Sequence, residues 1–135
     1  MKKKKDKAPI LSTLDKRFRS VLTSHLRRFS RFWQPSKNVQ DKARIARGMY
    51  QCSICSKIVG PKEIKIDHIE PVVPVTGFTN WDDLINRLFC EESGLQAICK
   101  DCHQIKTDKE NSDRRRLKKE KAVLQYFKEK VNKNE

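Results

Sequence analysis

Four of the five cysteines form two pairs with the same spacing, Cys52-x-x-Cys55 and Cys99-x-x-Cys102. Zinc prefers four soft or borderline ligands in a tetrahedron, and two such turns present four thiolates. In a secreted protein the same spacing could form disulfides. Here no apolar signal segment follows the lysine-rich start, and the number of cysteines is odd. The spacing therefore predicts a structural zinc site. The remaining Cys90 is expected to be a small buried hydrophobe.

A carboxylate and two imidazoles lie close to these pairs in the sequence. Asp67 and His68 are adjacent between the pairs, and His103 follows the last cysteine. A neutral imidazole can take a proton from water, and a carboxylate with an imidazole can bind a cation that polarises a phosphate. Successive strand residues point to opposite sides, so a shared site for Asp67 and His68 predicts a twist or bulge there. A simpler alternative for His103 is a hydrogen-bond donor beside the zinc site or a surface residue.

The chain carries 31 Lys plus Arg against 17 Asp plus Glu, a formal net charge of +14. Residues 1–47 hold 15 basic and 3 acidic side chains, residues 48–103 hold 5 and 8, and residues 104–135 hold 11 and 6. Basic flanks attract phosphates, while an acidic centre suits a cation, so nucleic acid is the expected partner. The alternative is that the basic runs are solvated faces. The residues expected to bind nucleic acid are Arg17, Arg27, Arg28, Arg31, Lys106, Arg114 and Arg115.

Apolar spacing and composition predict an α+β chain in four segments. Residues 1–12 form a disordered basic tail, and residues 13–47 a basic helical arm. In the arm, Pro35 ends one helix, whose apolar stripe is expected to be a packing face, and a second helix runs from Val39 to Ala46 and stops at Gly48. Residues 48–108 form the core, with strands near 64–69 and 95–98 and an intervening helix capped near Asn80. Residues 109–135 form a C-terminal basic helix. No apolar run is long enough to cross a membrane.

Six short motifs follow one another through residues 43–108. They are Tyr50-Gln51-Cys52-x-x-Cys55, Asp67-His68-Ile69-x-Pro71, Gly77-Phe78, Trp81-Asp82, Leu95-Gln96 and Cys99-x-x-Cys102-His103-x-x-Lys106-Thr107. In this order they resemble the HNH endonucleases, most closely the small phage-encoded members, and together they are more specific than any one of them. The resemblance implies a ββα-metal (HNH) core, here with a four-cysteine zinc site and flanking basic helices.

The resemblance also implies a role for each matching residue. His68 would be the general base, and Asp67 and His103 would be ligands of a catalytic Mg²⁺ or Mn²⁺, with Ni²⁺ or Co²⁺ also compatible with an imidazole ligand. Cys52, Cys55, Cys99 and Cys102 would hold the structural Zn²⁺. The chain departs from the family at Gly94, where an Asn usually precedes Leu-Gln. In the family that Asn holds the loop that bears the catalytic histidine or, in some members, binds the metal. Asn86 and Asn80 are possible substitutes, and Asn86 is the predicted catalytic one.

The expected function is therefore that of a metal-dependent DNA endonuclease that nicks double-stranded DNA, encoded by a phage or mobile element and acting in the host cytoplasm. A homodimer, a larger phage DNA-processing complex, and roles in homing, packaging, recombination or host DNA degradation are left open. One alternative is a catalytically inactive zinc-dependent nucleic-acid-binding module, with Gly94 marking a lost site. Another is an accessory protein whose basic arm docks on an acidic surface of a larger machine.

Overall fold

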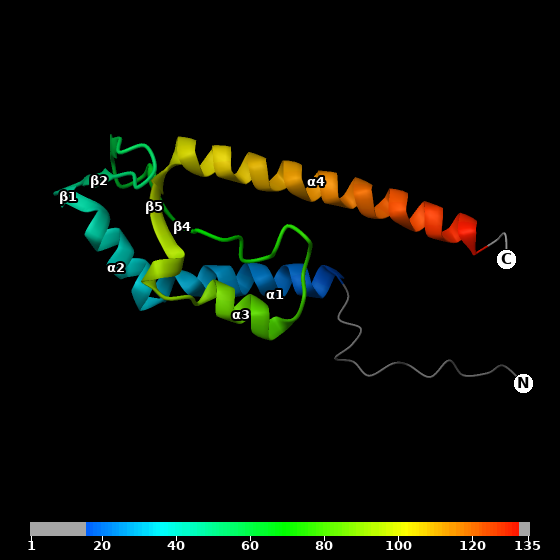
Figure 1. Cartoon of the computed structure of the whole chain (residues 1–135). Helices are drawn as coiled ribbons and strands as arrows, with labels where there is room; N and C mark the ends of the chain where they lie inside the picture. Colours follow the sequence, from blue (N-terminus) through cyan, green and yellow to red (C-terminus); the bar gives the residue numbers. More distant parts are fainter. Residues whose placement is uncertain (1–15, 133–135) are drawn as a thin grey trace, which may run out of the picture.

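The computed structural model describes residues 16–132 of the 135-residue chain, so the predicted tail at residues 1–12 lies outside the described part. Helices and short strands are mixed along the sequence (Figure 1). The elements are α1 (Lys16–Phe29), η1 (Ser30–Phe32), α2 (Gln34–Ala43), β1 (Arg44–Ala46), β2 (Met49–Gln51), β3 (Ile58–Val59), β4 (Ile64–His68), α3 (Trp81–Leu88), η2 (Glu92–Gly94), β5 (Leu95–Cys99) and α4 (Lys100–Val131). The predicted α+β class is confirmed.

Two small antiparallel sheets make up the β-structure, in the orders β1-β2-β3 and β4-β5. β4 pairs with β5 without a shift in register, from Ile64 opposite Cys99 to His68 opposite Leu95. α3 lies in the connection between these strands, and α4 begins at the residue after β5. The predicted strand pair, the intervening helix and the long helix that follows are therefore confirmed. Asn80 caps α3 as expected, because its side chain accepts a hydrogen bond from the Asp83 N–H.

Two clusters of buried apolar residues hold these elements together. The first contains Ile64 and Ile98 from the β4–β5 pair, with Val59 and two of the paired cysteines. The second joins the loop after β4 to α3, and Leu26 from α1 packs against it. The apolar stripe of α1 thus packs in part: Leu26 contacts the second cluster, whereas Phe18, Val21 and Phe29 are exposed.

Two sequence predictions for the basic arm are wrong. Pro35 lies in the first turn of α2, after Gln34, instead of ending α1, because a proline in the first helical turn loses no intrahelical hydrogen bond. The second helix ends at Ala43, and Arg44–Ala46 form β1, in which Arg44 pairs with Tyr50. Gly48 has a φ of +72° and lies in the short turn between β1 and β2, so it makes a hairpin where a helix stop was expected.

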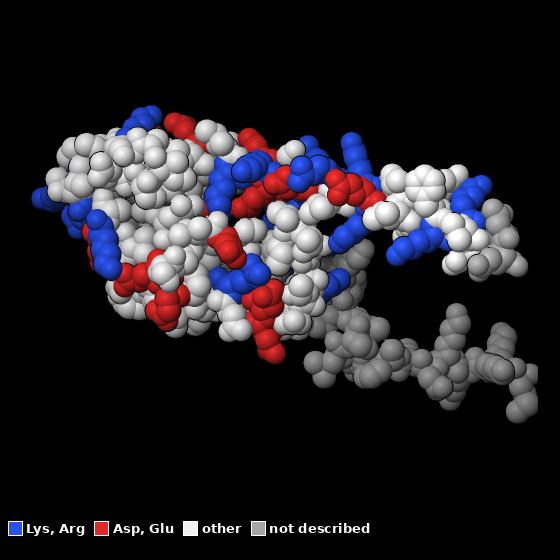
Figure 2. All heavy atoms as spheres, in the orientation of Figure 1, with Lys and Arg blue, Asp and Glu red and all other residues white. Residues whose placement is uncertain are grey.

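α4 continues through residue 108 without interruption and extends well beyond the β4–β5 pair (Figure 1). Its first turns contact β4 and β5, whereas residues near its end such as Leu124 and Phe127 are exposed. Basic and acidic side chains lie next to each other along α4 on the face drawn in Figure 2. Among the described residues, no helix has the combination of length and apolar character that crossing a membrane requires.

Candidate functional site

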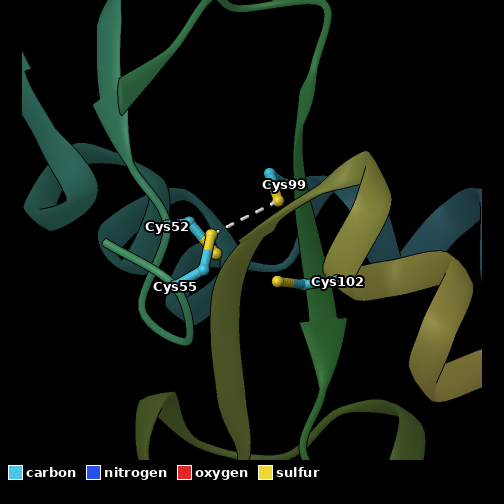
Figure 3. Close-up of side chains that lie close together, drawn as sticks. All are labelled: Cys52, Cys55, Cys99 and Cys102. Carbon is cyan, nitrogen blue, oxygen red and sulfur yellow. Dashed lines mark hydrogen bonds between the residues drawn. The ribbon is translucent and has the colours of Figure 1, made fainter. Parts of the chain in front are cut away.

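The two cysteine pairs meet at the start of α4. One pair lies in the turn after β2, and the other joins the end of β5 to the first turn of α4, so that the sulfurs converge (Figure 3). All four Sγ atoms lie within 4.8 Å of one another. The Sγ atoms of Cys55 and Cys99 are 3.8 Å apart. That separation is too long for a disulfide of about 2.05 Å and equals the sulfur spacing of about 3.8 Å expected around tetrahedral zinc. The cluster is compatible with the predicted structural zinc.

Backbone hydrogen bonds shape the first cysteine turn and attach it to the strand pair. The N–H of Cys52 donates to the Lys57 carbonyl, and the N–H of Ser56 donates back to the Cys52 carbonyl. Ser56 adopts the left-handed conformation, with a φ of 60°, which lets the chain reverse after the second cysteine. The N–H of Ser53 donates to the Ala97 carbonyl on β5. The turn is thereby held against the strand that leads to the other pair.

The thiols of this cluster differ in their acidity. Burial raises the pKa of Cys52, but backbone N–H groups of Cys55, Cys99 and Ile54 favour the thiolate more strongly and lower it to about 6. Burial and the hydrogen bonds shared with the other three sulfurs raise the pKa of Cys102 to about 12. Four thiolates packed this closely repel one another, so a cation at their centre is needed to ionise all of them.

Asp67 on β4 faces residues of β5 and α4. Its Oδ2 accepts hydrogen bonds from Gln96 Nε2 at 3.2 Å and from Lys106 Nζ at 2.7 Å. Its Oδ1 lies 3.8 Å from Nε2 of His103. Two metal–ligand bonds of about 2.1 Å each can span that separation, so one divalent cation could bind both side chains. The carboxylate and the imidazole therefore fit the cation site that the resemblance implies.

His68 contacts a different part of the molecule. Its Nε2–H donates to the Leu88 carbonyl at 2.9 Å, at the last residue of α3. In the neutral ring this hydrogen bond fixes the tautomer and makes Nδ1 the nitrogen that can accept a proton. A twist or a bulge was predicted here, and the β4–β5 register shows no bulge between Asp67 and His68. Both residues nevertheless line the same cleft.

Lys106 connects the residues of this cleft. Its Nζ donates to the His68 carbonyl at 2.5 Å and lies 3.0 Å from Glu110 Oε1, in addition to its contact with Asp67. Burial lowers the pKa of Lys106, but the hydrogen bonds to Asp67 and Glu110 outweigh burial and raise it. Sequence reasoning treated Lys106 only as a phosphate contact. The missed signal was its spacing, because residues 103, 106 and 110 share one face of a helix.

The cleft has a volume of about 860 Å³ and lies between the basic arm, β4 and α4. Its ionisable side chains are Arg27, Arg31, Lys37, Lys65, Asp67, His68, His103, Lys106, Glu110 and Arg114. Four of the seven residues predicted to bind nucleic acid thus lie on its walls. Arg17, Arg28 and Arg115 are exposed and do not line it. Arg114 also donates to the Val73 carbonyl at 3.0 Å, so it braces the loop after β4.

The presence of glycine at position 94 has a steric explanation that the sequence did not reveal. A Cβ at this position would lie 2.8 Å from the Sγ of Cys90. Cys90 itself is half-buried, whereas full burial was expected. The Gly94 carbonyl accepts the Ile69 N–H at 2.9 Å and so joins the two strand ends beside His68. Asn86, the predicted substitute, is exposed on α3 and outside the cleft. Within residues 16–132 its side chain makes no hydrogen bond, so its role stays a prediction without a supporting contact.

Comparison of the chain with protein-family models, with curated proteins and with solved structures finds no match. The likeness to HNH endonucleases therefore depends on the sequence motifs alone. Function has to be inferred from the positions and charges of the side chains.

Proposed function

We propose that this protein is a metal-dependent DNA endonuclease of HNH type that hydrolyses phosphodiester bonds. One observation carries the proposal: Asp67, His68 and His103 line a single cleft whose walls also carry Arg27 and Arg31. A proton acceptor, a pair of cation ligands and phosphate-binding groups are the parts that metal-assisted hydrolysis of a phosphodiester requires.

His68 acts as the general base in this proposal. Its ring is oriented by the hydrogen bond from Nε2–H to the Leu88 carbonyl, which leaves Nδ1 to accept a proton from the attacking water. The N–H of Ile69 and the carbonyl of Gly94 hold the chain just after it. Backbone groups thus supply the orientation for which the family uses an Asn side chain.

Asp67 and His103 would hold the catalytic cation, magnesium or manganese. When bound, that cation neutralises charge on the scissile phosphate and polarises it toward attack. Gln96 on the paired strand donates to Asp67 Oδ2, so that Oδ1 is directed toward His103. The fixed carboxylate costs little reorganisation when the cation binds.

Arg27 and Arg31 are exposed side chains on the wall of the cleft opposite α4. Guanidinium groups bind phosphates in two-point contacts, so these residues position the DNA backbone without reading its sequence. One cleft per chain cuts one strand at a time, and nicking is the expected product.

A second candidate is the catalytically inactive zinc-dependent nucleic-acid-binding module. One observation favours it: the ammonium group of Lys106 is already paired with Asp67 and Glu110. If that pairing were permanent, the carboxylate would serve the fold and the cleft would bind phosphates without cutting them.

Two assays on the same wild-type preparation separate these candidates. Binding of a labelled DNA duplex and relaxation of a supercoiled plasmid are measured with magnesium, with manganese and with a chelator of divalent cations, and the protein's zinc content is checked in each buffer. An endonuclease binds the duplex and nicks the plasmid only when a divalent cation is present. Duplex binding with no nicking under either cation contradicts the endonuclease and supports the binding module.

A further inference from the structure

The ammonium group of Lys106 lies among three oxygens of the cleft. They are Asp67 Oδ2 at 2.7 Å, the His68 carbonyl at 2.5 Å and Glu110 Oε1 at 3.0 Å. Oxygens that surround one cationic group in this way would also attract a metal ion. Two of the three oxygens belong to Asp67, the proposed cation ligand, and to His68, the proposed base.

A positive charge at this position opposes the binding of a second cation nearby. The contact of Lys106 with Asp67 occupies one carboxylate oxygen, and the other oxygen faces His103 at 3.8 Å. Like charges a few ångströms apart in a partly buried site repel one another more strongly than they would in water. While the ammonium stays on Asp67, affinity for a divalent cation is therefore reduced.

The lysine can leave this position without unfolding the helix. Its side chain is 22 % exposed and lines the cleft, on the same wall as Arg114 and facing the arm that carries Arg31. Its long, flexible stem ends in a point charge that can turn from a carboxylate to another anion in the cleft. A DNA phosphate held by the arginines is such an anion.

We propose that Lys106 is a gate that couples cation binding to DNA binding: its ammonium group occupies Asp67 in the free protein and moves to a backbone phosphate when DNA enters the cleft. This inference depends on the proposed function, because it assumes that Asp67 holds the cation. Before DNA arrives, the gate keeps the cation site weak. After DNA arrives, the released carboxylate and the phosphate bind the cation together, so hydrolysis is confined to the bound state.

Manganese affinity tests the gate without any cleavage. Binding of Mn²⁺ to zinc-loaded protein is measured by electron paramagnetic resonance for the wild type, Lys106→Met and Lys109→Met. Lys109 is an exposed lysine on the same helix that lies outside the cleft, so its replacement makes the same change in net charge away from the site. Without DNA, Lys106→Met should bind Mn²⁺ about tenfold more tightly than the wild type, and Lys109→Met within about twofold of it.

The measurements with DNA use proteins that also carry His68→Ala, so that the duplex is not cleaved during the titration. Adding a short duplex should tighten Mn²⁺ binding more in the protein with Lys106 than in Lys106→Met, so that their affinities differ by less than about threefold. Lys106→Gln serves as a second variant, and zinc content with thermal unfolding shows that each variant is folded.

Two results would overturn the gate: Mn²⁺ affinity that is equal or weaker in both folded Lys106 variants, or a tenfold gap that persists when DNA is bound. Failure of the proposed function is read separately, from the absence of plasmid nicking by the wild type.

Discussion

The β4–β5 strand pair carries a different site at each of its two ends. At one end, Ile64 pairs with Cys99, which belongs to the cysteine cluster. At the other end, His68 pairs with Leu95 beside the charged cleft. Cys52 and Cys99 are almost completely buried, whereas the His103 side chain is 44 % exposed. The cysteine end is therefore buried at two of its four cysteines, with Cys55 exposed, whereas the cleft end keeps an imidazole partly exposed.

The two ends of the strand pair differ in what they contribute to the protein. The described residues form two small buried clusters, which is a modest core for a chain of this size. A zinc ion at the cysteine end would supply stability that this core lacks, since a structural metal contributes to folding directly. The cleft end can then keep charged groups partly exposed, at a cost in stability that the other end offsets.

Loss of a zinc ligand should produce the largest effect. Cys99→Ser removes a buried thiolate, and structural zinc sites contribute on the order of 10 kcal/mol to folding, so the variant should lose zinc and its cooperative thermal transition. Zinc content and calorimetry measure both. Cys90→Ser is the matched control. Cys90 lies outside the cluster, so this variant should keep its zinc. A Cys99→Ser protein that unfolds like the wild type would contradict a stabilising metal at this end.

Removal of the cleft carboxylate should separate activity from stability. Asp67→Asn keeps the shape of the side chain but loses the anionic ligand, so nicking should fall by about 10² or more. The variant should keep its zinc, and its melting temperature should drop by only a few degrees. Plasmid nicking and calorimetry are compared with those of Asp101→Asn, whose carboxylate is exposed and pairs with Lys57. Equal losses of activity in the two variants would show that Asp67 has no special place in the reaction.

Gly94→Ala tests the close contact beside the cleft. The new Cβ would lie 2.8 Å from the Cys90 sulfur, so the variant should be destabilised by about 1 to 2 kcal/mol. Urea unfolding gives the difference. Cys90→Ala removes the obstructing sulfur, and the double variant should recover most of the lost free energy of unfolding. No recovery would mean that the glycine is required for another reason.

The smallest expected effect concerns the basic wall. Arg31→Gln removes a guanidinium from the cleft, so duplex affinity should fall by roughly threefold to tenfold and the salt dependence of binding should decrease by about one phosphate contact. Arg28→Gln, three residues earlier and outside the cleft, should change both quantities less. Binding isotherms at several salt concentrations measure them. The reverse ranking would place the DNA on another face.

The sequence predicted the cysteine end almost completely, because two turns of fixed spacing determine which four side chains meet. It also predicted β4, β5, α3 and α4 from apolar spacing and the Asn80 cap. It failed at Pro35 and at residues 44–46, where a proline compatible with a first helical turn and a glycine compatible with a hairpin were read as helix stops. Short segments like these are decided by pairing with distant strands, which local patterns do not contain.

The cleft end could be predicted only in part. Asp67, His68 and His103 were predicted from their types and their motif, and they line one cleft, but their neighbours come from segments far apart in the chain. The contacts of Lys106 with Asp67 and of His68 with Leu88 depend on how α4 and α3 pack against β4. The steric reason for Gly94 depends on Cys90, which only the folded chain brings within reach.

The role of His68 is tested most directly by single-turnover nicking of a supercoiled plasmid with magnesium or manganese, using zinc-replete wild type, His68→Ala and His25→Ala. His25 is an exposed histidine on α1 that lies outside the cleft, so it controls for the loss of an imidazole. A general base at position 68 predicts a rate that falls by about 10² to 10⁴ in His68→Ala and stays near the wild-type rate in His25→Ala. A folded, zinc-containing His68→Ala protein that nicks at the wild-type rate would contradict the assignment of His68 as the base.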